Sequence, residues 1–139
     1  MHFSQIFVLP LFSVVAVSGL AIRDADNVDG EAKLAKRNCY PGGVNWGNEY
    51  QVALDAVDIV CRDEFVGHYD GLSEWSVCYN LSAGKRVNFN VRRWAGTPGD
   101  LSFELCQKYL RLEIVGCGMG GQSYQGNWRF MSDPNSGTC

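Results

Sequence analysis

Eight side chains that could bind the hydroxyl groups of a sugar recur at alternate positions in three segments of the sequence. They comprise amides, guanidiniums, one carboxylate and one indole: Glu74, Asn88, Asn90, Arg92, Trp94, Gln125, Asn127 and Arg129. Amides and guanidiniums hold several hydrogen-bond donors and acceptors in fixed planes. Adjacent sugar hydroxyls need both kinds of group, and an aromatic ring can cover the C–H face. The pattern is therefore compatible with a carbohydrate-binding surface. An ordinary solvated sheet face and a dimer interface through this face or the sheet edge remain alternative interpretations.

These side chains need a sheet to position them. Residues 74–81 and 86–94 alternate between apolar and polar, and residues 82–85 form a turn signal, which predicts a β-hairpin. A third strand is predicted from Tyr124 to Phe130, with Tyr124, Trp128 and Phe130 facing inward. Its polar positions, including Gln125, Asn127 and Arg129, would extend the polar row of the hairpin.

Two amphipathic helices are predicted at about residues 48–62 and 101–113. Asn45 or Asn48 would cap the first helix, and Asp100 or Ser102 the second. The last turn of the second helix could instead be a short strand. The right-handed crossover rule then makes the final strand parallel to the second strand of the hairpin. The expected fold class is α+β, a small disulfide-stapled sandwich with two helices packed on a mainly antiparallel sheet, in the order α-β-β-α-β.

The N-terminal part of the chain predicts secretion. Residues 6–17 form an uncharged apolar run followed by small residues, which is typical of a signal peptide spanning residues 1–21 rather than of a membrane span. Residues 22–37 are polar and end in the dibasic pair Lys36-Arg37, which predicts a short propeptide cleaved there. A buried N-terminal helix and a chance basic pair are the alternatives. A single domain would then occupy residues 38–139, and the mature protein would be extracellular.

Six cysteines lie in this domain, an even number that in a secreted chain predicts three disulfide bonds: Cys39, Cys61, Cys78, Cys106, Cys117 and Cys139. Sequence does not choose among the fifteen pairings. Their spacing predicts no zinc site, and we expect no metal and no cofactor.

Residues 38–139 hold 8 basic and 11 acidic side chains, a net charge of −3. That charge argues against nucleic acid or an anionic membrane as the main partner.

Catalytic patterns are sparse, and we expect no enzyme. His68, Glu74 and either Arg92 or Arg93 are the residue types of a small secreted ribonuclease, which needs a base, an acid and a phosphate clamp. A lone loop histidine is more often plain surface, so the nuclease stays a minor alternative. Asn80 begins the sequence Asn-Leu-Ser, which predicts an N-glycosylation site.

Several motifs of the sequence occur together in a known pattern. A Cys and Gly-Gly with Trp46 stand ahead of a helix ending at Cys61, and a strand cysteine, Cys78, follows. Two longer motifs come next: Leu105-Cys106-x-x-Tyr109-Leu110-x-x-Glu113-Ile114-x-x-Cys117-x-x-Gly120-Gly121 and Trp128-x-Phe130-x-x-Asp133-Pro134-Asn135-x-Gly137-x-Cys139. Together these motifs resemble a family of small secreted fungal glycan-binding proteins, the glycan-binding protein Y3-like domain known from ink-cap mushrooms.

This resemblance implies a disulfide-stapled α+β sandwich, recognition of glycans or glycoproteins without catalysis, and a homodimer. It assigns no individual binding residue. Two functional classes remain open: a lectin with a defence or effector role, and a secreted toxin or effector that acts on a protein or cell surface without binding sugar.

Overall fold

The computed structural model describes residues 37–139 with the exception of residue 83. The predicted signal peptide and all of the predicted propeptide except Arg37 lie outside the described residues. The elements, in chain order, are β1 (Arg37–Cys39), η1 (Gly47–Glu49), α1 (Tyr50–Val60), η2 (Cys61–Phe65), β2 (Gly67–Tyr69), β3 (Glu74–Asn80), β4 (Lys85–Arg93), β5 (Gly99–Leu101), α2 (Phe103–Gly116), β6 (Gly121–Gln125) and β7 (Trp128–Ser136).

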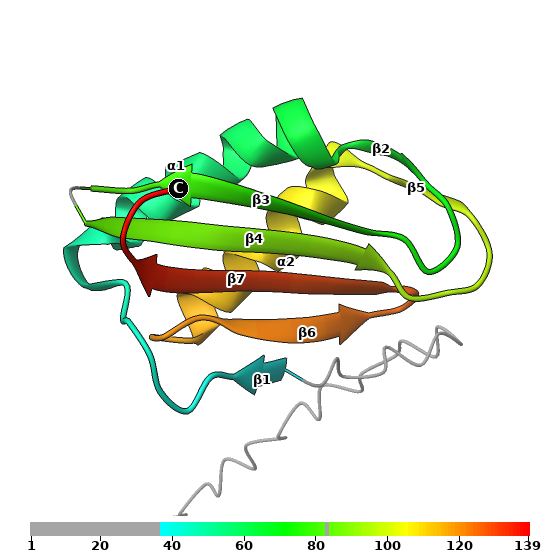
Figure 1. Cartoon of the computed structure of the whole chain (residues 1–139). Helices are drawn as coiled ribbons and strands as arrows, with labels where there is room; N and C mark the ends of the chain where they lie inside the picture. The colour runs from blue at the N-terminus through cyan, green and yellow to red at the C-terminus, as the bar shows by residue number, and fades with distance from the viewer. Residues whose placement is uncertain (1–36, 83) are drawn as a thin grey trace, which may run out of the picture. The chain divides into compact units, whose positions relative to one another are not determined.

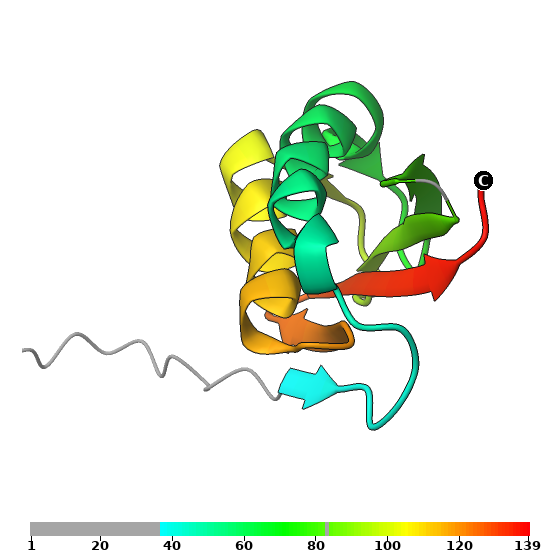
Figure 2. The ribbon, with the colours of Figure 1, turned by 90° about the vertical axis from the view of Figure 1, so that its left-hand side faces the viewer.

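A five-stranded sheet organises the domain, in the order β1-β6-β7-β4-β3, and every neighbouring pair in it is antiparallel. Figure 1 looks onto one face of this sheet and shows α1 and α2 behind it. The perpendicular view in Figure 2 shows the two helices side by side on that one face, so no helix of the described residues covers the opposite face. A two-stranded ribbon of β2 and β5 lies apart from the main sheet. The predicted α+β class, two helices on a mainly antiparallel sheet, is confirmed.

The predicted single strand from Tyr124 to Phe130 is wrong. The segment forms the hairpin of β6 and β7, in which Gln125 pairs with Trp128 across a two-residue turn. Gly126 begins this turn at φ +59°, a left-handed conformation that glycine adopts without steric cost. The crossover from β4 through α2 leads to β6, which runs parallel to β4 as predicted. However, β7 returns between them and is antiparallel to β4.

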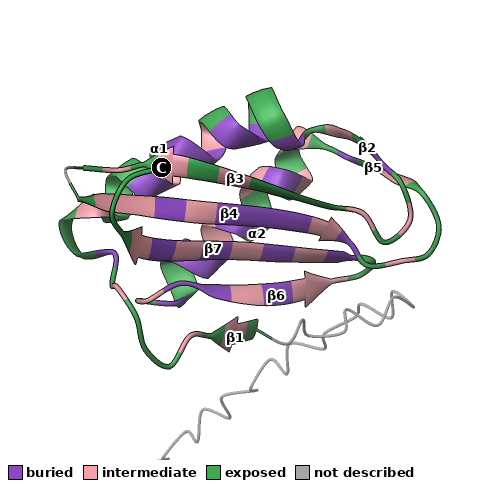
Figure 3. Cartoon of the chain, viewed as in Figure 1, coloured by how far each residue is buried: buried purple, intermediate pink, exposed green. Residues whose placement is uncertain are grey.

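The core lies between the helices and the covered face of the sheet. Val87, Phe89 and Val91 of β4 and Phe130 of β7 are fully buried, and the apolar stripes of α1 and α2 pack against them. This burial is visible as the purple bands along β4 and β7 in Figure 3. Alternation within each strand directs one side chain in two toward the helices, which is why the period-two pattern identified these core residues.

The helix boundaries differ in part from the prediction. The Ser102 hydroxyl accepts a hydrogen bond from the backbone N–H of Leu105 at 3.2 Å and so caps α2 as expected. The helix continues to Gly116, so the alternative of a strand in its last turn is wrong. No side chain caps η1 or α1, which corrects the predicted asparagine cap. Beyond α1, the π-helical turn η2 carries the fully buried Phe65 into the core.

All six cysteines form disulfide bonds, in the pairs Cys39–Cys117, Cys61–Cys106 and Cys78–Cys139. The first ties β1 to the end of α2, the second ties the end of α1 to α2, and the third ties the C-terminus to β3. The segment 117–139 is therefore held at both ends, although its two cysteines pair with different partners.

Candidate functional site

The face of the five-stranded sheet opposite the helices, here called the open face, carries a continuous field of polar side chains. Residues paired across antiparallel strands point to the same side, so the strand registers identify its members. They are Asn38, Glu74, Ser76, Cys78, Asn80, Arg86, Asn88, Asn90, Arg92, Gln122, Tyr124, Arg129, Met131, Asp133 and Asn135.

Four of these side chains form a hydrogen-bonded cluster, here called the polar network: Glu74, Ser76, Asn90 and Arg129. The Arg129 Nη2 donates to Glu74 Oε1 and to Asn90 Oδ1, each at 2.7 Å. The Asn90 Nδ2 donates to Glu74 Oε1 and to Ser76 Oγ, also at 2.7 Å. Asn90 is only 2% exposed. Because buried hydrogen bonds to charged groups are strong and directional, the network holds its side chains in fixed positions.

An aromatic surface lies beside the polar network. The Arg92 guanidinium lies over the Trp94 ring, 4.8 Å from its centroid, and Trp94 meets the Tyr124 ring edge-on at 5.3 Å. The Trp94 backbone N–H donates to the Asn127 carbonyl at 2.7 Å, which anchors the end of β4 to the turn between β6 and β7. Trp94 remains 48% exposed. This site therefore combines fixed polar groups with an accessible aromatic ring, as a sugar requires.

A hollow of about 310 Å³ opens between β3, β4 and β7. Ser76 of the polar network lines it together with Cys78, Asn88, Met131, Val77 and Phe89. The lining of the hollow therefore combines polar groups on β3 and β4 with the Met131 side chain of β7. It extends the open face along β4 from Asn90 to Asn88, away from Trp94.

The structure brings five of the eight predicted binding residues together: Glu74, Asn90, Arg92, Trp94 and Arg129. Asn88 lies on the same face and lines the hollow, and Asn127 occupies the turn, where its carbonyl holds Trp94. Gln125 does not belong to this site. It lies on the covered side of β6, where its amide donates to the buried Ser123 hydroxyl at 3.2 Å.

The same error of register misplaced Tyr124, which was predicted in the core and lies on the open face. A two-residue turn pairs Gln125 with Trp128 and Tyr124 with Arg129. Continuous alternation would instead have placed Tyr124 on the side of Trp128. Because Gly-Asn between two strand-like runs is itself a hairpin signal, Gly126-Asn127 could have revealed the turn in the sequence.

Two other aromatic residues that the sequence places in glycine-rich loops are part of the core. Trp46 is 2% exposed, and its indole N–H donates to the Cys117 carbonyl at 2.8 Å. The Tyr69 hydroxyl donates to the Phe65 carbonyl at 3.0 Å, and burial raises the pKa of this phenol. Neither ring is available to a ligand.

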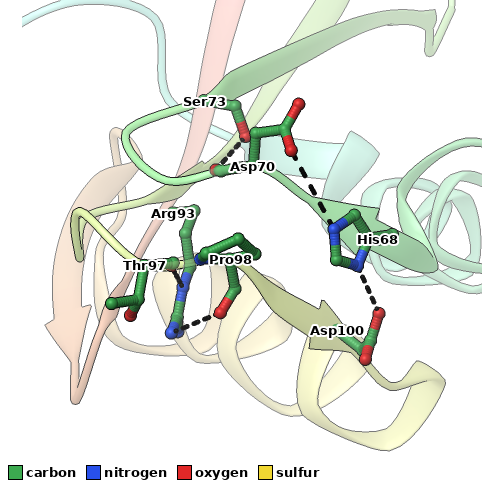
Figure 4. Close-up of polar contacts among 7 residues, drawn as sticks. All are labelled: His68, Asp70, Ser73, Arg93, Thr97, Pro98 and Asp100. Atoms are coloured by element: carbon green, nitrogen blue, oxygen red, sulfur yellow. Dashed lines mark hydrogen bonds and ion pairs between the residues drawn. The ribbon is translucent and has the colours of Figure 1, made fainter.

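The residues considered for the ribonuclease alternative do not form one cluster, because Glu74 pairs with Arg92 whereas His68 and Arg93 have other partners. Figure 4 shows His68 between two carboxylates, with its Nδ1 2.9 Å from Asp100 and its Nε2 4.0 Å from Asp70. Arg93 lies on the covered side of the sheet, where it donates to the carbonyls of Thr97 and Pro98. Glu74 belongs to the polar network. Among the described residues, no group of His, Cys, Asp and Glu could hold a metal ion.

The fold and the open face together define a small disulfide-stapled α+β domain with a polar and aromatic surface on one side of its sheet. The family model of glycan binding domain Y3 matches residues 53–139, more than half of the chain. The chain therefore belongs to the glycan binding domain Y3 family, and the resemblance read from its cysteine and tryptophan motifs is confirmed. The matched region begins within α1 and includes every strand of the open face except β1. A search of curated proteins found no match.

Proposed function

We propose that this protein is a secreted, non-catalytic lectin that binds glycans on its open face, above the polar network and Trp94. The observation that carries this proposal is the position of Trp94. Its ring is about half exposed and stands directly beside Arg92 and the fixed hydrogen-bonding groups of Glu74, Asn90 and Arg129. Membership of a glycan-binding family supports the ligand class, and the face supports the location.

The chemistry of binding follows from the exposed parts of this site. The Trp94 ring would cover the apolar C–H face of one sugar. Arg92 would donate to its hydroxyl oxygens, and the second carboxylate oxygen of Glu74 would accept from a hydroxyl. Asn88 would serve the next sugar in the hollow. Asn90 and Arg129 act mainly by positioning Glu74, because Asn90 is buried and the Arg129 side chain is 16% exposed.

Secretion is part of the proposal. Three disulfide bonds are compatible with an extracellular protein. In the part of the chain that the structure describes, no helix is long and apolar enough to cross a membrane. Cleavage after residue 21 and after Arg37, an attached glycan at Asn80, and a defence or effector role complete the proposal. We also propose a homodimer, formed through the open face or through an edge of the sheet.

Trp94 and Trp75 offer a matched pair for testing the location. Both are about half exposed, at 48% and 52%, but Trp75 lies on the covered side of β3 against Tyr69. A glycan array with the mature protein should identify bound glycans. Trp94→Ala should then weaken binding about tenfold or more, which corresponds to about 1.5 kcal/mol for an aromatic contact. Trp75→Ala should leave binding within about twofold, and circular dichroism should confirm that both variants are folded.

Two results would reject the proposal. If no glycan binds above background, the protein is not a lectin of this kind, and an effector acting on a protein without sugar recognition becomes the better hypothesis. If Trp75→Ala weakens binding as much as Trp94→Ala, the site is not on the open face. RNA degradation that is lost in His68→Ala would instead support the ribonuclease.

A further inference from the structure

We propose that the preferred ligand is an acidic glycan, with a carboxylate or sulfate group bound by Arg92. This inference rests on the proposed function and specifies its ligand. It arises from an imbalance of charge at the centre of the open face, where Arg92 and Arg129 stand directly opposite each other on β4 and β7. Like charges in directly opposite positions destabilise a sheet unless something neutralises them.

Glu74 is the one carboxylate that contacts both arginines, and its hydrogen bond goes to Arg129. Its Oε1 accepts from Arg129 and from Asn90 at 2.7 Å. Its Oε2 is 3.8 Å from the Arg92 Nη1, which is beyond hydrogen-bond distance. The Arg129 Nη2 therefore has two close acceptors, whereas Arg92 lies within ion-pair range of Glu74 but has no acceptor at hydrogen-bond distance among the described residues.

The guanidinium of Arg92 is positioned to bind an oxyanion. It lies over the Trp94 ring at 4.8 Å, and its side chain is 29% exposed. A guanidinium presents two parallel N–H groups that match the two oxygens of a carboxylate or sulfate, and stacking on an aromatic ring leaves that edge free. A neutral sugar would use this edge less fully.

The charge distribution of the whole domain favours the same ligand. The open face carries three arginines and two acidic residues, namely Arg86, Arg92, Arg129, Glu74 and Asp133. It is therefore positive by one charge, although residues 38–139 together are negative by three. The acidic excess lies elsewhere, largely on the helices and their connecting loops. An anionic glycan would consequently meet an attractive potential at the open face and a repulsive one over the rest of the domain.

The test compares matched ligands on the mature protein. A neutral oligosaccharide from the array is titrated beside the same oligosaccharide carrying a sialic acid, a uronic acid or a sulfate. We expect the acidic forms to bind about tenfold more tightly at low salt, and this preference to fall to about threefold or less in 1 M NaCl, where the Debye length is about 3 Å. Preference for the carboxylates alone or for the sulfate alone supports the proposal and identifies the anion.

The variants Arg92→Gln and Arg62→Gln remove the same charge from different places. Arg92→Gln should weaken binding of the neutral glycan about threefold and of the acidic glycan about thirtyfold, so that the preference disappears. Arg62, in η2 beyond α1, pairs with Asp63, and Arg62→Gln should retain the preference. Equal affinity for neutral and acidic glycans would overturn this inference while leaving the lectin proposal intact. An acidic preference that survives in Arg92→Gln would also overturn it, whereas binding of no glycan at all would overturn both.

Discussion

Replacing Glu113 by glutamine should stabilise the protein, and increasingly so as the pH rises. Glu113 lies on α2 against the covered side of β6 and is fully buried. Neither carboxylate oxygen has a hydrogen bond of good geometry among the described residues. Burial raises the pKa of this carboxyl from its ordinary value of 4.5, and it outweighs the opposing influence of the nearby Ser123 hydroxyl and of the Arg37 charge.

The sign of the pH dependence follows from this raised pKa. Between the two pKa values the folded state binds more protons at Glu113 than the unfolded state does. The stability that depends on the protonated form is therefore fully present below about pH 4 and is lost as the pH rises through the raised folded-state pKa. Glutamine has the shape of the neutral acid and never ionises. The variant should match the wild type near pH 4 and exceed it by about 1–3 kcal/mol at pH 8, because only the wild type then carries the cost of a buried ionisable group at a pH where the unfolded chain is ionised.

Thermal unfolding followed by circular dichroism between pH 4 and pH 8 measures this difference. For a domain of this size each kcal/mol corresponds to about 4–8 °C in Tm. The control is Glu104→Gln in the exposed first turn of the same helix, which should cost a few tenths of a kcal/mol at neutral pH because it removes a favourable charge near the helix N-terminus. A difference between wild type and Glu113→Gln that stays constant from pH 4 to pH 8 would refute the reasoning.

If Lys36-Arg37 is a processing site, a chain beginning at Asn38 should show a steeper loss of stability with pH, because it lacks the Arg37 charge.

Three further predictions concern a disulfide bond, the cap of α2 and a glycosylation site on the surface. Replacing Cys78 and Cys139 together by serine should cost about 4 kcal/mol in urea unfolding, because the bridge closes a loop between residues 61 apart; a cost below about 1 kcal/mol would mean that β7 and the C-terminus hold their place without it. Ser102→Ala should cost about 1 kcal/mol in the same assay, since it removes the α2 cap, and an unchanged midpoint would contradict that role. Asn80 is exposed at the end of β3, and its Oδ1 accepts from the Cys139 N–H, a bond that a sugar on Nδ2 leaves intact. Mass spectrometry of the secreted protein should therefore show a glycan that is lost in both Asn80→Gln and Ser82→Ala, and an unmodified wild-type mass would exclude it.

Local periodicity predicted most of the fold because burial on one side leaves a repeating mark in the sequence. The alternation of Val87, Phe89 and Val91 located both β4 and the face that the helices cover. The helical spacing of Cys106, Leu110 and Ile114 located α2 in the same way. The disulfide pairing depends on which elements meet in space, and nothing in the spacing of six cysteines records that. The buried Glu113 was also beyond prediction, because a charged side chain in an amphipathic helix normally faces solvent.

The candidate site was predictable where it depends on a single hairpin. Glu74, Asn90 and Arg92 belong to β3 and β4, whose register follows from one short turn, and their shared face was correctly predicted. The contribution of the third strand depended on a second turn that the alternation concealed. The aromatic side chains show the same limit: the rings of Trp46 and Tyr69 are buried by distant segments, whereas that of Trp94 is left exposed.

The turn at Gly126-Asn127 thus decides how the site is composed. By reversing the chain after Gln125 it places Arg129, rather than Gln125, on the open face and opposite Arg92, and it brings Tyr124 against Trp94. The polar network requires this arrangement, because Arg129 links Glu74 of β3 to Asn90 of β4 from the neighbouring strand β7. Arg129 thereby forms the hydrogen bond to the Glu74 carboxylate, whereas Arg92 lies 3.8 Å from it. The positive charge of Arg92 is then available for a ligand to neutralise. A single two-residue turn in the sequence therefore accounts for both the rigidity of the open face and the acidic ligand that we propose for it.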